Sequence, residues 1–198
     1  MVKFYFGISG IFFLVCAGLI LSSSPLRAEG EAVIDNLNDA DLGNKLGGAW
    51  EVWLRTQDDP TQNCKMSFAK DDALGDPTGH AMQLDYDVDS ENPAYNGVRT
   101  DLNHFDASGF KTLNLYVKGD GARGFPPNLK IELIGPDKRP SPYLITGITD
   151  QWQKFTVPLS EFWLIQDLKR VEKFVVVFAD ITSSPKIGTI YIDQVYFE

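Results

Sequence analysis

Apolar and polar residues alternate with a period of two along several segments of this chain. In residues 81–88 the apolar side chains share one parity and the polar ones the other: Met82, Leu84, Tyr86 and Val88 against Gln83, Asp85 and Asp87. Successive side chains of an extended strand point to opposite faces, so this pattern predicts half-buried strands. The alternation recurs in residues 98–102, 113–118 and 129–133. One face of each strand should therefore enter a core, and the other should meet water or a ligand.

Turn-forming residues separate these segments. Clusters rich in Gly, Pro and Asp occupy residues 118–121, 124–127 and 135–137, at a spacing typical of all-β sandwiches. Residues 174–178 are continuously apolar, which predicts a central strand covered on both faces, and residues 189–197 supply a last strand. Helical turns are expected in residues 160–170. The predicted fold is all-β: one antiparallel β-sandwich, in the form of a jelly roll.

The first 28 residues have the layout of a secretory signal. Lys3 precedes an apolar stretch, residues 4–21, and a short segment ending at Ala28 follows it. We expect an N-terminal signal helix, cleavage near Ala28, and export to the periplasm or the extracellular space. Left uncleaved, the apolar stretch is long enough to act as a membrane anchor. The expected domains are a signal peptide at 1–28 and a single β-sandwich at 29–198.

Charge and cysteine content exclude several functions. The chain carries 27 acidic and 18 basic residues, a formal net charge of -9. This argues against a nucleic-acid-binding surface, which needs clustered Lys and Arg to replace the counterions of phosphates. Of the two cysteines, Cys16 lies in the signal, which leaves Cys64 without a partner for an intramolecular disulfide. We expect Cys64 to be buried in a strand at residues 63–68 rather than to act as a nucleophile.

Enzymatic motifs are absent from the sequence. It has no Gly-x-Ser-x-Gly elbow, no His-Glu-x-x-His, no Gly-x-x-x-x-Gly-Lys phosphate loop and no Cys-x-x-Cys. Two carboxylates could act as a glycosidase pair, but their separation depends on the fold. We therefore expect a non-catalytic protein.

Several segments resemble a known family. They are residues 32–37, 44–50, 95–98, 115–121, 151–162 and 190–197. In this order they resemble galactose-binding-like jelly rolls, especially the family 11 type of carbohydrate-binding module and the related complex I intermediate-associated protein group. The resemblance implies a sandwich that holds a sugar chain on its concave face or edge loops, with a structural calcium ion near the joined chain ends. Such a scaffold does not by itself fix a function.

Sugar recognition needs an aromatic ring against the pyranose and polar groups for its hydroxyls. The alternation gives an outward-facing set: Gln83, Asp85, Arg99, Asp101, Tyr116, Lys118, Lys130 and Glu132. The candidate ligand-binding residues are Tyr95, Arg99, Asp101, Tyr116, Glu132 and Trp53. The alternative is an ordinary solvated surface with charges paired across strands.

The four tryptophans are expected to differ in role. Trp50 and Trp53 have opposite parity, so one of them should face away from the core. Trp152 is expected to pack in the core, and Trp163 to pack under a loop.

Oxygen donors concentrate at the start of the predicted domain. Five fall within seven residues: Asp35, Asn36, Asn38, Asp39 and Asp41. Such hard donors suit Ca²⁺, although their spacing is not that of an EF-hand. By the resemblance, Asp193 in the last strand would meet the segment that holds Asp35, which makes Asp35 and Asp193 the candidate ligands of a structural Ca²⁺. The alternative is that these residues form a turn.

The sequence as a whole favours an exported, non-catalytic carbohydrate-binding module whose partner is a polysaccharide or an oligosaccharide. The alternative is a protein-interaction or assembly module on the same scaffold. Its marker would be an exposed apolar patch, or a polar face too convex for a sugar, and pull-down of a defined protein partner would separate the two.

Overall fold

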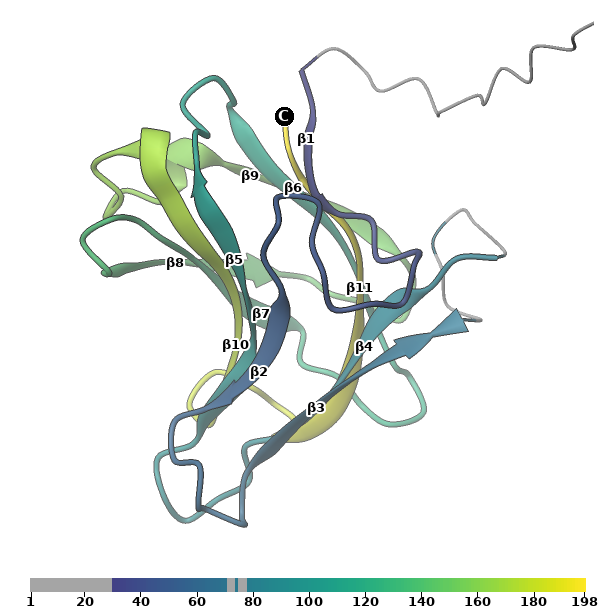
Figure 1. The fold of residues 1–198 in the computed structure, drawn as a ribbon. Coiled ribbons are helices and arrows are strands. Elements are labelled where there is room, and N and C mark those ends of the chain that lie inside the picture. Colours follow the sequence, from purple (N-terminus) through teal and green to yellow (C-terminus); the bar gives the residue numbers. More distant parts are fainter. Residues whose placement is uncertain (1–29, 71–73, 75–77) are drawn as a thin grey trace, which may run out of the picture.

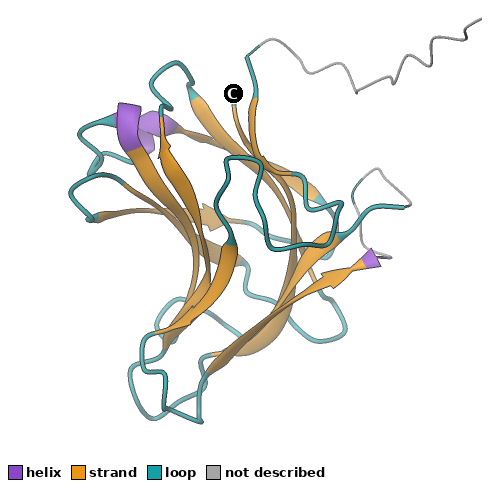
Figure 2. Cartoon of the chain, viewed as in Figure 1, coloured by secondary structure: helices purple, strands orange, loops and turns teal. Residues whose placement is uncertain are grey.

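The computed structural model describes residues 30–70, residue 74 and residues 78–198. Strands and loops make up almost the whole of this part (Figure 2). The predicted signal segment lies outside the described residues. Among the residues described, no helix is both long enough and apolar enough to span a membrane.

The strands form two antiparallel sheets (Figure 1). The six-stranded sheet contains β1 (Ala32–Asp35), β3 (Asn63–Ala69), β4 (Ala81–Asp87), β6 (Thr112–Gly119), β9 (Gln153–Pro158) and β11 (Ile187–Phe197). Its order is β3-β4-β11-β6-β9, and β1 also pairs with β11. The five-stranded sheet contains β2 (Trp50–Leu54), β5 (Tyr95–Phe105), β7 (Asn128–Ile134), β8 (Pro140–Thr146) and β10 (Val171–Ala179), in the order β2-β5-β10-β7-β8.

Aromatic pairs join the two sheets across the core. Tyr86 of β4 stacks on Phe178 of β10 with their ring centroids 4.2 Å apart. Phe197 of β11 likewise stacks on Phe105 of β5 at 5.4 Å. Burial of these rings and of the aliphatic residues around them holds one sheet on the other. The chain is thus an all-β, two-sheet antiparallel sandwich, as predicted.

The local predictions about buried residues are mostly confirmed. β10 is central in its sheet, and its residues Val175 and Val177 are buried even though their parity points away from the core. Trp50 faces the core and Trp53 does not. Cys64 is buried, and desolvation raises the pKa of its thiol to about 12, which makes it a poor nucleophile. Short 3₁₀ turns, η2 (Leu159–Glu161) and η3 (Leu168–Arg170), occupy the predicted helical region.

Two tryptophan predictions are wrong. Trp152 is half-buried outside the core, with the Lys118 ammonium 5.4 Å from its ring centroid. Trp163 is 74% exposed rather than packed under a loop. Both lie in irregular connections, where strand parity gives no information about which way a side chain points.

Both sheets bend in the same direction (Figure 1). The outer surface of the five-stranded sheet is therefore hollowed, and we call it the concave face. The outer surface of the six-stranded sheet bulges outward, and we call it the convex face. Residues of one parity reach these faces, while the other parity fills the core.

Candidate functional site

A groove of about 360 Å³ lies on the concave face. Its lining residues are Trp53, Arg99, Glu132, Ile134, Lys138, Pro140, Lys173 and Val175. They come from β2, β5, β7, β8 and β10 and from the turn between β7 and β8. The whole width of the sheet therefore contributes to one groove.

The strand register arranges these residues in rows across the sheet. In one row, Trp53 lies opposite Gly97, which lies opposite Val177. In the next row, Arg99 lies opposite Val175, which lies opposite Glu132. The small side chains of the central strands form a floor, and the larger aromatic and charged side chains stand on either side of it.

Gly97 keeps this floor flat. Its φ is +152°, and a Cβ there would lie 2.0 Å from the carbonyl oxygen of Val176. Only glycine tolerates such an approach without a shift of the backbone. The position beside Trp53 is therefore free of a side chain, which leaves room over the floor.

Charged residues around the groove are paired with one another. Nε of Arg99 lies 2.5 Å from Glu51, and Nζ of Lys130 lies 3.1 Å from Glu132. Nζ of Lys173 lies 2.7 Å from Asp101. Partly exposed pairs of this kind contribute at most about 1 kcal/mol each to stability. They do fix the positions of donors and acceptors that a hydroxyl-rich ligand can use.

The groove continues into a second hollow of about 220 Å³, with which it shares Lys138 and Lys173. Here the carboxylate of Glu172, which is buried, pairs with Lys138 and lies 3.5 Å from Nδ1 of His104. The hydrogen bond from Lys138 lowers the pKa of Glu172. The Glu172 carboxylate thus links His104 of β5 to Lys138 of the β7–β8 turn.

The backbone around this hollow is unusual. Asn103, His104 and Lys138 all have positive φ, at 50°, 57° and 62°. The pairing of β5 with β10 shifts register at the same place, between Val171 and Lys173, which marks a β-bulge. Bulges and left-handed non-glycine residues often occur beside functional sites, where they redirect side chains.

The structure brings together four of the six predicted ligand-binding residues. Trp53, Arg99 and Glu132 line the groove, and Asp101 lines its continuation. Tyr95 lies at the start of β5, where Arg55 and Lys130 approach its ring at 5.1 and 5.8 Å. Its ring is therefore already in contact with cations.

Tyr116 is separated from the other five. It lies on β6 in the six-stranded sheet, opposite Lys154 and Asp193 of the neighbouring strands. The predicted outward-facing set splits in the same way: Arg99, Asp101, Lys130 and Glu132 belong to the five-stranded sheet, whereas Gln83, Asp85, Tyr116 and Lys118 belong to the six-stranded sheet. Alternation identified outward-facing positions but could not assign them to a sheet.

Sequence reasoning missed Lys138, Lys173, His104 and Glu172. Lys173 directly precedes the apolar run of β10, and extension of the alternation by one residue would have found it. His104 lines the second hollow and Lys138 lines both hollows, and each has a positive φ at a position where the sequence has no glycine to indicate one.

The two predicted metal ligands are both buried and both hydrogen-bonded. The Asp35 carboxylate accepts hydrogen bonds from the Leu37 amide at 2.9 Å and from the Trp50 indole at 2.8 Å, while burial raises its pKa. The Asp193 carboxylate accepts from the amides of Leu74 and Gln194. A carboxylate offers about four lone-pair sites, and the two bonds to Asp35 occupy two of them.

Other donors near Asp35 were predicted to assist. Oδ1 of Asn38 is buried without a hydrogen-bond partner among the described residues, as expected of a ligand. Asp39 instead pairs with Lys45, and Asp41 accepts from the Gly43 amide. The described residues contain no cluster of three or more His, Cys, Asp or Glu around one point. A calcium ion at Asp35 and Asp193 stays a prediction.

No protein-family model matches the chain, and no curated protein matches it. Solved structures do. The family 11 carbohydrate-binding module of the cellulosomal cellulase Lic26A-Cel5E of Clostridium thermocellum is 15% identical, with a TM-score of 0.60 over 86% of this chain and 95% of that one. A family 11 module from Clostridium thermocellum, in complex with a β-1,3-1,4-mixed-linked tetrasaccharide, is 16% identical, with a TM-score of 0.61 over 86% and 96%.

A third match includes a catalytic module. The CBM22-1-GH10 modules of endo-1,4-β-D-xylanase 10B from Clostridium thermocellum, complexed with xylohexaose, are 12% identical, with a TM-score of 0.51 over 86% of this chain and 28% of that one. At such identities the likeness shows the fold, which is that of family 11 and family 22 carbohydrate-binding modules. The predicted resemblance to family 11 modules is confirmed. The resemblance to the complex I intermediate-associated group stays a prediction.

Proposed function

We propose that this protein is a non-catalytic carbohydrate-binding module that holds a glycan chain in the groove of the concave face. The observation that carries the proposal is the groove itself, in which Trp53 lies beside a flat floor and between fixed, paired charges. A family 11 module of this fold has been solved in complex with a tetrasaccharide, and a xylanase that contains this fold beside its catalytic module has been solved with xylohexaose; both support a carbohydrate ligand.

The chemistry of the groove suits a pyranose chain. The Trp53 ring offers an apolar surface to the C–H face of a sugar. Arg99 and Lys130 can donate hydrogen bonds to sugar hydroxyls, and Glu132 can accept hydrogen bonds from them. The groove crosses several strands and is open on the surface, which favours internal residues of a chain over a chain end.

Export and calcium belong to the same proposal. The segment 1–28 would direct the domain to the periplasm or the extracellular space, where polysaccharides are met. A calcium ion held by Asp35 and Asp193 would join the first and last strands, β1 and β11, and would stabilise the scaffold without entering the groove.

A glycan array followed by calorimetry tests the proposal, with the mixed-linked tetrasaccharide and xylohexaose as first probes. We expect micromolar to millimolar binding in wild type and a Kd at least about tenfold higher for Trp53→Ala, since a central aromatic contact is commonly worth 1–2 kcal/mol or more. Tyr116→Ala is the matched control because this aromatic residue lies on the convex face. Arg99→Ala should weaken binding less than Trp53→Ala does.

Two outcomes would count against the groove. One is an array with no bound glycan, and the other is equal loss for Trp53→Ala and Tyr116→Ala. The assembly module stays a prediction. Among the described residues, the large apolar side chains that are exposed are Leu42, Leu144, Trp163, Ile181 and Ile187. Single exposed apolar residues are normal on soluble domains. Recovery of one defined protein partner in a pull-down, with no glycan bound, would favour that module.

A further inference from the structure

The convex face also carries a hollow, of about 380 Å³, on the opposite side of the sandwich from the groove. Its floor consists of two rows of outward-facing residues across three strands. One row is Asn63, Asp87 and Ile187; the other is Lys65, Asp85 and Thr189. Arg123, from the loop between β6 and β7, forms one wall.

The loop that carries Arg123 is attached firmly to β11. The amide of Asp120 donates to the Thr189 carbonyl at 3.0 Å, and the amide of Thr189 donates to the Gly124 carbonyl at 2.9 Å. Gly188 permits this approach, because a Cβ there would lie 2.5 Å from the Gly124 oxygen. The loop is therefore positioned by the sheet rather than left to move over it.

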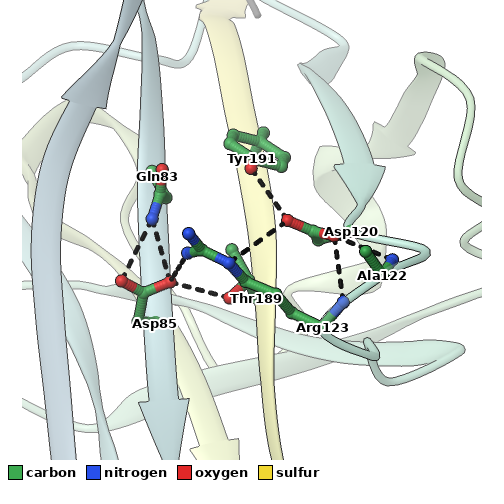
Figure 3. Close-up of polar contacts among 7 residues, drawn as sticks. All are labelled: Gln83, Asp85, Asp120, Ala122, Arg123, Thr189 and Tyr191. Atoms are coloured by element: carbon green, nitrogen blue, oxygen red, sulfur yellow. Dashed lines mark hydrogen bonds and ion pairs between the residues drawn. The ribbon is translucent and has the colours of Figure 1, made fainter.

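The Arg123 side chain is held from both sides (Figure 3). Its Nη1 lies 3.1 Å from the Asp85 carboxylate, and its Nε lies 3.7 Å from that of Asp120.

Each of these carboxylates is fixed in turn. Asp85 accepts from Thr189 at 2.7 Å and from Gln83 at 3.0 Å, and Asp120 accepts from the Tyr191 hydroxyl at 3.0 Å. The network spans β4, β11 and the loop (Figure 3).

Stability alone gives little reason for this network. Arg123 is 56% exposed, and ion pairs at such positions contribute at most about 1 kcal/mol. A guanidinium has five N–H donors, and two nitrogen positions are used here, so donors remain for a ligand. Rigid, partly unsatisfied donors at the edge of a hollow are what a binding site needs, since little entropy is lost when a ligand is bound.

The charges in the hollow favour a neutral ligand. Lys65 and Arg123 face Asp85, Asp87 and, beside Arg123, Asp120, so the hollow has no excess positive charge to attract an anion, and Arg123 is already paired with carboxylates. Arg123, Lys65 and Asn63 can donate hydrogen bonds, Asp87 can accept them, and the half-exposed Ile187 offers an apolar surface. Hydrogen-bond donors and acceptors beside an apolar surface suit a saccharide, which has many hydroxyls and apolar C–H faces.

We propose that the convex-face hollow is a second saccharide-binding site, with Arg123 as its central donor. The inference rests on the proposed function for the class of ligand but not for the location of the site. Because the two sites open on opposite faces, one molecule can bind two glycan chains at once and cross-link them.

The test compares four proteins on a glycan array and in calorimetric titrations with the bound glycans: wild type, Trp53→Ala, Arg123→Ala and the double variant. For a glycan that both sites accept, we expect each single variant to keep one site of wild-type affinity and one weakened site, and the double variant to keep no site of wild-type affinity. Arg170→Ala, another exposed arginine, is the matched control. Amide NMR shifts of Thr189 and Arg123 on titration of wild type give a readout that needs no mutation.

The outcomes separate the two proposals. If Trp53→Ala alone abolishes all binding and the Thr189 and Arg123 amides do not shift, the second site is overturned and the groove stands. If Arg123→Ala abolishes all binding and Trp53→Ala has no effect, the groove is overturned and the hollow is the binding site. Unchanged binding in Arg123→Ala also overturns the second site.

Discussion

The concave and convex faces are built from the same pattern of alternating residues, yet they differ in what forms their hollows. On the concave face, Val175 lies in the floor of the groove, with Gly97 and Val177 in the adjoining row, and side chains of the flanking strands form the walls. On the convex face, polar side chains form the floor, and a wall is supplied by Arg123 of the loop between β6 and β7.

Sheet curvature explains the difference. Side chains on a concave surface converge, so strands alone can enclose a groove once the floor residues are small. Side chains on a convex surface diverge, so a hollow there needs a loop folded back onto the sheet. The bonds from Asp120 and Gly124 to Thr189 provide this. The two faces should therefore respond differently to changes in strands and to changes in loops.

The largest expected effect comes from the glycines under each site. Gly97→Ala places a Cβ 2.0 Å from the Val176 oxygen at a φ of +152°, and we expect it to lower the free energy of unfolding by about 3 kcal/mol. Gly188→Ala meets the Gly124 oxygen at 2.5 Å and should cost less, because the loop can move away. Urea denaturation measures both.

The control for both is Gly109→Ala, whose added Cβ would have no atom within 4 Å. The contrast extends to binding: Gly97→Ala should weaken the groove and spare the hollow, and Gly188→Ala should do the reverse. If both variants impair both sites equally, the two faces are not independent.

Calcium removal should affect the scaffold under both faces equally. An ion that binds only the folded state contributes about 2.7 kcal/mol when its concentration is 100 times its Kd. We therefore expect chelation to lower Tm by several degrees and to leave the ratio of groove to hollow affinity unchanged. Asp193→Asn should remove the response to chelator. A Tm that chelation does not alter contradicts the calcium prediction.

The smallest expected effect concerns Glu172 at the end of the groove. Its pKa is lowered in the folded state by the hydrogen bond from Lys138, so its charged form stabilises the fold. This stability is present above the ordinary Glu pKa of about 4.3 and is lost as pH falls through the lower folded value. At pH 7 the free energy of unfolding of wild type should exceed that of Glu172→Gln by no more than about 1 kcal/mol, because Lys138 is largely exposed.

Urea denaturation from pH 7 to pH 3 measures this difference, with the exposed Glu161→Gln as control. Wild type should be more stable to urea than Glu172→Gln, by an amount that shrinks as the pH falls. It should be no more stable than Glu161→Gln. An advantage that is constant with pH would mean that Glu172 acts through packing rather than charge.

The strands were predictable because their signal is local. Alternation in residues 81–88 and 129–133 predicted β4 and β7 closely, and the apolar run of β10 predicted a central strand. Parity also predicted that only one of Trp50 and Trp53 faces the core, and the structure shows that it is Trp50. These predictions succeed because a strand's two faces have fixed directions relative to its own backbone.

The composition of each face was not predictable, because it depends on which strands are neighbours. Arg99 and Tyr116 have similar local patterns, but one lies on β5 and the other on β6, in different sheets. His104 and Lys138 have positive φ values at positions where the sequence has no glycine to indicate them. Strand pairing and backbone direction in turns are set by tertiary packing, which one sequence does not report.

The position of β11 has a consequence for how the protein is made. This strand lies between β4 and β6 and also pairs with β1, yet it follows all three in the sequence. Until Ile187–Phe197 is in place, the strand edges that face it have no partner. A chain cut before this strand cannot close its six-stranded sheet, so the assembly of the whole sheet depends on this one segment.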